Sequence, residues 1–300
     1  MDDASLAHWL RLRERVDWTA RSAALTETII GTLPRDRPVS VLDLATGAGS
    51  NLRYLAERLP TPQRWLLIDR SAALLSEAEA RTRAWASERD YAVHADSKES
   101  VGFSPATRSF SIEGPRLDCH VEMRLQDLGR LDDRSIFSGR DLVTASALLD
   151  LVSEAWLRTL AAHCRAAGAA ALFTLTYDGR SACAPAEPED EQVRGLMNQH
   201  QHRDKGLGGA AEGPEAAECA ERCFVDAGYR VSSEASDWVL GTGHAALQQT
   251  LIDGWARAAS EQAPGEAQTI KSWRTRRLAH VAAGVSRIVV GHRDIAAWRE

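Results

Sequence analysis

The sequence has few cysteines, few lysines and no long apolar run. Five cysteines in 300 residues are too few for the dense disulfide framework that holds small secreted domains together. The longest nearly unbroken apolar run, residues 166–175, is about half as long as a helix that crosses a bilayer. The start Met1-Asp2-Asp3 has neither the basic residues nor the apolar stretch of a signal peptide. We therefore expect a globular protein in a reducing cytoplasm, without a membrane span.

The charge balance is mildly acidic. Lys and Arg number 36, Asp and Glu number 42, and the formal net charge is −6. Such a chain does not suit a phosphate backbone as its main partner, so we expect no nucleic acid partner. Only three of the basic residues are lysine, a bias that indicates a GC-rich bacterial genome. With 44% hydrophobic residues and both charge signs interspersed, the chain can bury one large core or two modest ones.

Strands and helices alternate in the pattern. Short β-branched or apolar runs at 39–44 and 65–69 predict buried strands, and the stretches 51–59 and 72–85 after them predict helices. Strand, helix, strand and helix in this order predict a parallel sheet with right-handed crossovers. The remaining elements extend this pattern: helices over the first thirty-odd residues, then strands at 141–144, 170–177, 229–233 and 286–290, and helices at 153–167, 215–227, 243–260 and 266–283.

Two stretches depart from this alternation. Residues 107–113 and 117–125 alternate apolar and polar positions, which predicts a hairpin inserted at about residues 90–118, before the third strand, as a surface decoration. Residues 178–214 are polar and broken by proline and glycine, which is typical of a linker or an active-site cover. We therefore divide the chain into an N-terminal helical cap (1–38), a ligand-binding core (39–177), a lid or acceptor-binding segment (178–214) and C-terminal elements that complete the sheet (215–300).

A glycine turn follows the first predicted strand. Asp43 lies near the end of that strand, and Gly47 and Gly49 follow it, at the place where open α/β sheets bind nucleotide-like ligands. A dinucleotide fingerprint needs a third glycine at position 52, which is Leu52. The acid ahead of the turn also suits a ligand with a cationic amino group better than a pyrophosphate.

Acidic residues also follow the next two strands. Asp69 comes 20 residues after Gly49, a spacing that fits a ribose in both NAD and adenosyl ligands. Asp127 follows the strand that ends near 125, where it can accept a hydrogen bond from an adenine amine. Each acid alone could cap a helix, but three at successive strand ends beside a glycine turn favour a ligand site.

These segments, with the strand at 141–144 that runs into small residues, resemble the class I S-adenosylmethionine-dependent methyltransferases. The resemblance covers residues 39–177, and residues 215–292 are consistent with that family's final helix and antiparallel strand pair. It implies a Rossmann-like doubly wound α/β fold, mostly parallel with an antiparallel last strand and three α/β/α layers. It also implies S-adenosyl-L-methionine as cofactor and S-adenosyl-L-homocysteine as product. The sequence has Ala45 where the commonest form of the motif has glycine.

The resemblance also implies roles for individual residues. Asp127 and the Leu128 N–H would hold the adenine, Asp69 the ribose, and Ser146 would lie beside the sulfonium. Arg21 is a candidate partner for the methionine carboxylate, or an ordinary surface arginine. The remaining predicted cofactor contacts are Asp43, Thr46, Gly47, Gly49, Asn51 and Arg70.

The sequence says less about the methyl acceptor than about the cofactor. We expect a small molecule, with methylation of RNA or protein, a non-catalytic adenosylmethionine-binding subunit and, more distantly, a nicotinamide oxidoreductase as alternatives. A general base is needed only when the acceptor must lose a proton. His200, His202 and Asp150 are the candidates, against a solvated lid or a helix cap. Trp238, Trp255 and Trp273 are candidates for an acceptor wall or for core packing. No metal site is predicted, because Cys219 and Cys223 lack a second pair at zinc spacing.

Overall fold

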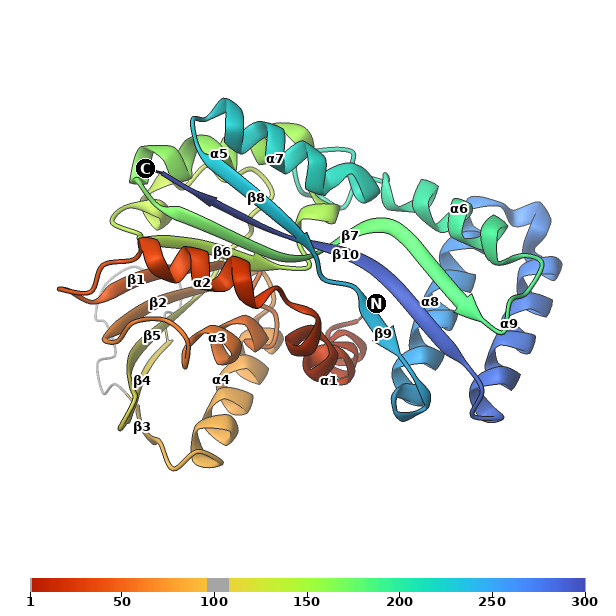
Figure 1. Ribbon diagram of the computed structural model, residues 1–300, viewed down its shortest axis with the longest axis horizontal. Coiled ribbons are helices and arrows are strands. Elements are labelled where there is room, and N and C mark those ends of the chain that lie inside the picture. Colours follow the sequence, from red (N-terminus) through yellow and green to blue (C-terminus); the bar gives the residue numbers. More distant parts are fainter. Residues whose placement is uncertain (1, 96–107, 300) are drawn as a thin grey trace.

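A mixed β-sheet runs through the computed structural model, which describes residues 2–95 and 108–299 (Figure 1). Five strands are parallel, in the order β5-β2-β1-β6-β7. Their bounds are β1 (Val39–Leu44), β2 (Gln63–Asp69), β5 (Leu117–Leu125), β6 (Leu142–Ser146) and β7 (Ala170–Ala184). The strand order reverses between β1 and β6, so the sheet is doubly wound, as predicted, and its ligand crevice is expected above the carboxyl ends of these strands.

Antiparallel strands complete both edges of the sheet. The last strand, β10 (Arg287–Trp298), pairs antiparallel with β7, which confirms the predicted antiparallel last strand. On its other side β10 pairs with β8 (Arg230–Ala235) and β9 (Trp238–Leu240). At the opposite edge β3 (Ala92–Ala95) and β4 (Arg108–Gly114) extend the sheet beyond β5.

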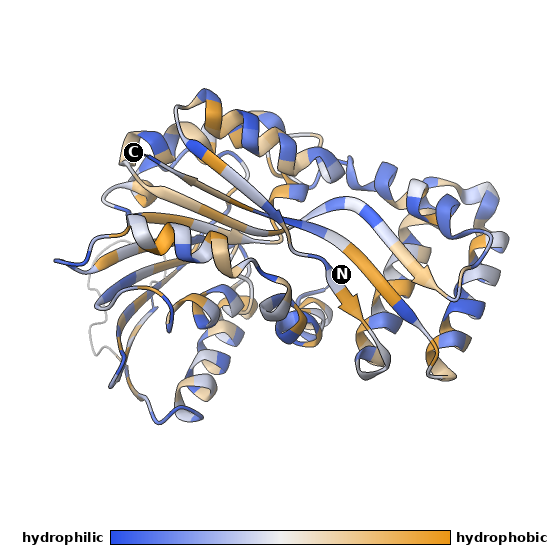
Figure 2. Ribbon diagram, viewed as in Figure 1, coloured by the Kyte–Doolittle hydropathy of each residue, from blue (hydrophilic) through white to orange (hydrophobic). Residues whose placement is uncertain are grey.

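Helices cover both faces of the sheet, which gives the predicted three layers. On one face lie α2 (Ala23–Thr32), α3 (Ser50–Leu55) and α4 (Ala72–Ser87), and on the other lie α5 (Glu154–Ala167) and α7 (Ala216–Asp226) (Figure 1). Neighbouring strand residues point to opposite faces: Val41 belongs to the apolar cluster under α2–α4 and Leu42 to the cluster under α5 and α7. Serine caps start α2, α4 and α5. The helices carry both orange and blue residues in Figure 2, which is typical of helices with one buried face.

A helical lobe continues the fold beyond the central sheet. β7 and β10 extend together past the parallel strands, and α6 (Asp190–Gln201), α8 (Ala245–Gln262) and α9 (Ala267–Ala282) pack against this extension (Figure 1). A third apolar cluster fills the lobe. The fully buried Arg277 bonds the Asp190 carboxylate and the Pro185 carbonyl oxygen, which ties α9 to α6. The first helix, α1 (Asp3–Ala20), contacts α4, α8 and β9 and so lies between the sheet and this lobe.

Several predicted elements need correction. The second arm of the predicted hairpin is β5, which pairs parallel with β2 and is the third core strand rather than a decoration. The hairpin added at the sheet edge consists of β3 and β4, and Thr107 lies outside the described residues. β7 continues to Ala184, so its last seven residues belong to a strand and not to a lid. α3 ends at Leu55 rather than at 59, and β9 was not predicted.

Within the described residues, five short 3-10 helices connect the larger elements. They are η1 (Arg134–Phe137), η2 (Leu149–Leu151), η3 (Gly213–Glu215), η4 (Thr242–His244) and η5 (Pro264–Glu266). Along residues 2–95 and 108–299, no helix is long and apolar enough to cross a membrane.

Candidate functional site

The glycine turn lies at the carboxyl end of β1 and has left-handed backbone at three positions. Gly47 and Gly49 have φ of 54° and 76°, and Ala45 has φ of 50°. Glycine adopts this conformation without penalty, whereas a Cβ makes it strained. A Cβ placed on Gly47 would lie 3.1 Å from Leu10 Cδ1, so α1 packs directly over the turn. The turn therefore offers bare backbone, with α1 as its cover.

Asp43 organises the polar groups below this turn. The carboxylate is fully buried and accepts hydrogen bonds from Thr46 Oγ1 at 2.5 Å and from Asn51 Nδ2 at 2.7 Å. Burial raises the pKa of Asp43 to about 6, against a smaller lowering by these two hydrogen bonds. The structure thus brings three predicted cofactor residues into one network, with a titratable group at its centre.

Arg21 joins this network from the junction of α1 and α2. Its Nη1 donates to Asn51 Oδ1 at 2.9 Å and its Nη2 donates to Ser146 Oγ at 3.0 Å. The guanidinium lies 4.4 Å from the Tyr54 ring centroid and is buried, so Arg21 is not a surface arginine. Its Nε is buried and has no hydrogen-bond partner among the described residues. An unpaired buried donor is costly, and an anionic ligand group would satisfy it.

Asp69, at the end of β2, is fixed by the backbone. Its Oδ2 accepts from the Gly47 N–H and its Oδ1 from the Ser71 N–H, both at 2.9 Å. Each carboxylate oxygen keeps further acceptor capacity. Burial raises the pKa of Asp69, partly offset by these backbone bonds. The side chain of the next residue, Arg70, is exposed.

The end of β5 lies next to Asp69. The backbone N–H of Gln126 donates to the Asp69 carbonyl oxygen at 2.9 Å, which places the segment after β5 beside β2. Asp127 is exposed, and its Oδ1 accepts from the Gly129 N–H at 2.7 Å. Leu128 is buried, and its carbonyl oxygen accepts from Trp156 Nε1 at 2.7 Å. The three predicted acids thus lie at or just beyond the carboxyl ends of three neighbouring strands, at one end of the sheet.

Strained backbone also occurs at this end of the sheet. Besides Ala45 after β1, Ala147 directly after β6 has φ of 52° and Leu175 in β7 has φ of 58°. These strands are neighbours, and the Ala147 N–H donates to the Thr174 carbonyl oxygen at 2.8 Å. Non-glycine residues in this conformation cost energy and concentrate at functional sites. The strain marks the carboxyl ends of β1 and β6 and the neighbouring point of β7 independently of any motif.

Asp150 lies in η2, four residues after Ser146 at the end of β6. It is buried, and its Oδ1 has no hydrogen-bond partner among the described residues. Burial raises the pKa of Asp150 to about 6, and the nearby charges of Arg13 and Lys205 lower it by less. Asp150 therefore lies beside the end of the sheet that carries the glycine turn.

The two candidate histidines have partners elsewhere. His200 Nε2 lies 3.0 Å from Glu261 Oε2 on α8. His202 Nδ1 lies 3.2 Å from the Ala211 carbonyl oxygen, and its Nε2 lies 3.4 Å from Glu215. These contacts hold the histidines to the lobe and to η3, so the geometry favours Asp150, and a chemical role for His200 or His202 remains only a prediction.

Sequence reasoning missed the residues of α1 that hold it in place. Glu14 accepts from Arg53 Nε at 2.8 Å and also pairs with Arg81. Arg53 Nη1 in turn donates to the Ala48 carbonyl oxygen at 2.8 Å, within the glycine turn. Sequence spacing carried no signal for this network, because its members lie on three helices that only the fold brings together.

The three tryptophans are buried members of the apolar cluster of the helical lobe, which confirms the core interpretation: Trp238, Trp255 and Trp273. Trp238 also lies next to α1, where its Nε1 donates to Asp17 Oδ1 at 3.0 Å, and its ring lies 4.9 Å from the His292 ring.

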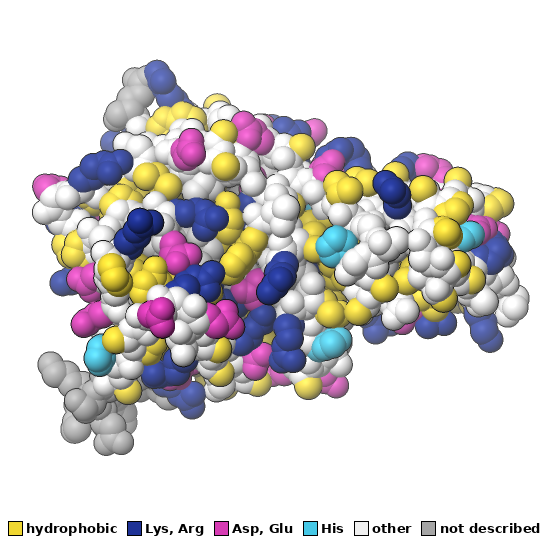
Figure 3. All heavy atoms as spheres, turned by 60° about the horizontal axis from the view of Figure 1, so that its bottom comes forward, with side chains coloured by type: hydrophobic (Ala, Val, Ile, Leu, Met, Phe, Trp, Pro, Cys, Tyr) yellow, Lys and Arg dark blue, Asp and Glu magenta, His cyan; other side chains and the backbone are white. Residues whose placement is uncertain are grey.

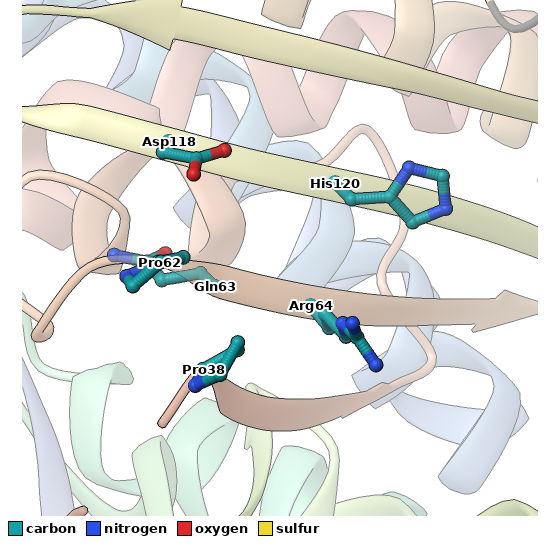
Figure 4. Close-up of a pocket in the computed structure, with 6 residues that line it drawn as sticks. All are labelled: Pro38, Pro62, Gln63, Arg64, Asp118 and His120. Carbon is teal, nitrogen blue, oxygen red and sulfur yellow. The ribbon is translucent and has the colours of Figure 1, made fainter. Parts of the chain in front are cut away.

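Two other features do not belong to this network. Ligand atoms of Glu154, Glu212 and Cys219 come within 4.8 Å of one another. However, Glu154 pairs with Arg158, and Glu212 accepts from a backbone N–H. An open depression at the amino ends of β1, β2 and β5 is lined by Pro38, Pro62, Gln63, Arg64, Asp118 and His120 (Figure 4). It lies at the opposite end of the strands from the glycine turn.

No family model matches the chain, and no curated protein sequence matches it. Comparison with solved structures finds similar chains. The YcgJ protein from Bacillus subtilis is 13% identical with a TM-score of 0.46, over 93% of this chain and 100% of that one. Geranyl diphosphate C-methyltransferase from Streptomyces coelicolor A3(2) is 14% identical with a TM-score of 0.44, over 93% and 79%. The cyclopropane synthase MmaA2 from Mycobacterium tuberculosis is 10% identical with a TM-score of 0.42, over 91% and 83%.

Proposed function

We propose that this chain is an S-adenosyl-L-methionine-dependent methyltransferase that acts on a small molecule. One observation carries the proposal: Asp43 and Asp69 lie at the carboxyl ends of the adjacent strands β1 and β2, and both accept hydrogen bonds from the glycine turn. The Gly47 N–H donates to Asp69 Oδ2, so the turn and the second acid are one unit. Acids suit a ligand that carries an ammonium group and a ribose.

Each part of this cofactor would have a candidate partner among the described residues. Asp69 has acceptor capacity for the ribose hydroxyls, and Asp43 supplies negative charge near the ammonium group. The unpaired Arg21 Nε suits the methionine carboxylate. Asp127 has one oxygen held by the Gly129 N–H, which leaves the other oxygen for the adenine amine. A Cβ at Gly47 would fill the space between the turn and α1.

The chain's task in such a reaction is alignment and exclusion of water. When bound, the cofactor supplies a methyl group on a sulfonium, which already carries the activation for in-line displacement. The protein must hold the acceptor atom on the far side of that methyl group and keep water out. Ser146, held by Arg21, and the strained Ala147 lie at the end of β6 where the acceptor would approach. The cover that excludes water is α1.

The surface supports a small acceptor over RNA. On the face shown in Figure 3, Lys and Arg side chains lie among Asp and Glu side chains rather than in one field. With a net charge of −6, such a surface gives little attraction to a phosphate backbone. A tight, salt-sensitive complex with RNA would contradict the small-molecule proposal.

The test is methyl transfer from the labelled donor. The purified chain is incubated with methyl-labelled S-adenosylmethionine and fractionated cell extract, and each fraction is analysed by mass for a gain of one methyl group. We expect label in a small-molecule fraction, with S-adenosylhomocysteine formed in equal amount. Intact cofactor binding without transfer in any fraction would favour a non-catalytic binding subunit instead.

A further inference from the structure

Three buried polar atoms without hydrogen-bond partners belong to residues near Tyr177 of β7. In the described part of the chain, Asp150 Oδ1, Thr176 Oγ1 and His292 Nδ1 are buried and accept or donate no hydrogen bond. Two of these residues flank Tyr177: His292 pairs with it across β10 and β7, and the Tyr177 N–H favours the charged form of Asp150. Unpaired buried polar atoms are rare in folded proteins. Asp150 Oδ1 lacks a partner among the described residues, and a bound ligand would supply one.

Rings and charges surround this place. The Trp238 ring lies 4.9 Å from the His292 ring, and the Tyr177 ring lies 6.2 Å from it. Arg13 of α1 lies 4.9 Å from the Trp238 ring centroid, and its Nε bonds Asp17 Oδ2 at 2.9 Å. Arg13 is therefore already neutralised by Asp17.

Two groups remain to set the local charge. Burial lowers the pKa of His292 to about 3, so this ring is neutral near pH 7. Lys205 lies near Asp150 from the loop after α6 and carries the remaining positive charge. The Tyr177 hydroxyl is engaged with Asn198 Oδ1 at 2.7 Å. Among the three unpaired atoms, Asp150 Oδ1 belongs to a carboxylate, whereas the low pKa of His292 makes its ring a poor base.

We propose that Asp150 is the general base of the acceptor site and that the acceptor is a neutral compound with a hydroxyl group. This inference rests on the proposed methyltransferase function. The acceptor O–H donates to Asp150 Oδ1, four residues after Ser146, so the oxygen lies beside the predicted place of the sulfonium. The rings of Tyr177, His292 and Trp238 lie buried beside one another next to it.

The charges of this step balance. The acceptor oxygen forms a bond to the methyl carbon, the carbon–sulfur bond breaks, and sulfur keeps the electron pair. The hydroxyl proton passes to Asp150, so the positive sulfonium and the negative carboxylate both become neutral. A protonated amine would bring an additional positive charge next to Lys205, which this site disfavours. An alkene or a thioether has no such proton for the base to accept.

The experiment compares Asp150→Asn with the unchanged chain. Asparagine keeps the shape of aspartate and removes the base. The matched control is Asp226→Asn, at an exposed residue of α7. Both variants are checked by thermal unfolding and by calorimetric titration with S-adenosylmethionine, and turnover is followed on the acceptor found in cell extract. We expect Asp150→Asn to lower kcat by about 100-fold or more, with a cofactor Kd within about twofold of the unchanged chain and with Asp226→Asn fully active.

The product identifies the acceptor class. Methyl label on oxygen supports the inference, and label on nitrogen, sulfur or carbon overturns it. Activity of Asp150→Asn within about threefold of the unchanged chain also overturns it. If Asp150→Asn does not fold, Asp150→Ser replaces it, and activity within about threefold of the unchanged chain overturns the role. Cofactor binding without transfer to any fraction refutes the proposed function, and this inference fails with it.

Discussion

Leu10 Cδ1 lies 3.1 Å from the position that a Cβ on Gly47 would occupy. The glycine turn and α1 are therefore in direct contact, and a ligand that lies on the turn must share this space with the helix. Additional contacts hold α1 there: Trp18 Nε1 donates to Ser50 Oγ at 3.0 Å, and Ser71 Oγ donates to Asp3 Oδ2 at 2.7 Å. Movement of α1 is the step we expect to admit the cofactor.

Glu14→Gln tests the attachment of α1. Arg53 is 2% exposed and depends on Glu14 for its charge partner. Loss of one member of a buried pair leaves the other uncompensated, so we expect the free energy of unfolding to fall by about 3 kcal/mol. Hydrogen exchange of residues 3–20 should become faster than in the unchanged chain.

The matched control for this variant is Glu77→Gln. Glu77 pairs with Arg11 at 3.0 Å, but the Arg11 side chain is 62% exposed. Exposed pairs contribute about 0–1 kcal/mol, so this variant should unfold nearly as the unchanged chain does. Equal effects of the two substitutions would contradict the role of Glu14 as the buried link.

The raised pKa of Asp43 predicts that cofactor binding depends on pH. Burial raises its pKa to about 6, so its contribution to stability is present below its unfolded pKa of about 4 and is lost as pH rises through 6. The ionised form is the one that attracts a cationic ammonium group. We therefore expect affinity for S-adenosylmethionine to rise between pH 5 and 7, by up to about tenfold per unit below 6, and to level off above that pH.

Asp43→Asn should flatten this profile, measured by calorimetric titration at each pH. Asp150 also has a pKa near 6 through burial, so Asp150→Asn is the control and should keep the slope. A profile that stays steep in Asp43→Asn would assign the titration to another group.

Ala45→Gly is expected to stabilise the protein. Ala45 has φ of 50°, where an L side chain is strained by about 1–2 kcal/mol. Glycine relieves this strain but loses more chain entropy on folding, so the expected net gain is about 0.5–1 kcal/mol. Ala48→Gly is the control: it is 3% exposed and lacks positive φ, so it should destabilise. Denaturant unfolding measures both, and a loss of stability in Ala45→Gly would contradict the strain.

The residues proposed for the cofactor could be identified from the sequence because their signals are local. Asp43 and Asp69 stand at strand ends, and strand ends follow from short apolar runs and glycines in the sequence. Parallel strands align their carboxyl ends at one edge, so the sheet brings these acids together without further information. The hydrogen bond from the Gly47 N–H to Asp69 shows that the turn after β1 contacts the end of β2. The positive φ of Ala45 was not predicted, since alanine gives no sign of it.

The acceptor half could not be predicted in the same way. Arg13, Tyr177 and His292 lie on α1, β7 and β10, and their contacts depend on how three distant segments pack. The polar composition of residues 178–214 suggested a lid, but β7 continues to Ala184 because β10 pairs with it there. His200 and His202 stood out by residue type, whereas Asp150 was distinguished by its burial and its unpaired oxygen.

The most direct test of the cofactor site is calorimetric titration of the whole chain and of Asp69→Ala with S-adenosylmethionine. Asp118→Ala, at the opposite end of the strands (Figure 4), is the matched control. We predict one binding site per chain, unchanged affinity in Asp118→Ala and no measurable binding in Asp69→Ala. Unchanged affinity in Asp69→Ala, or no binding to the unaltered chain, would contradict the assignment of this edge to the cofactor.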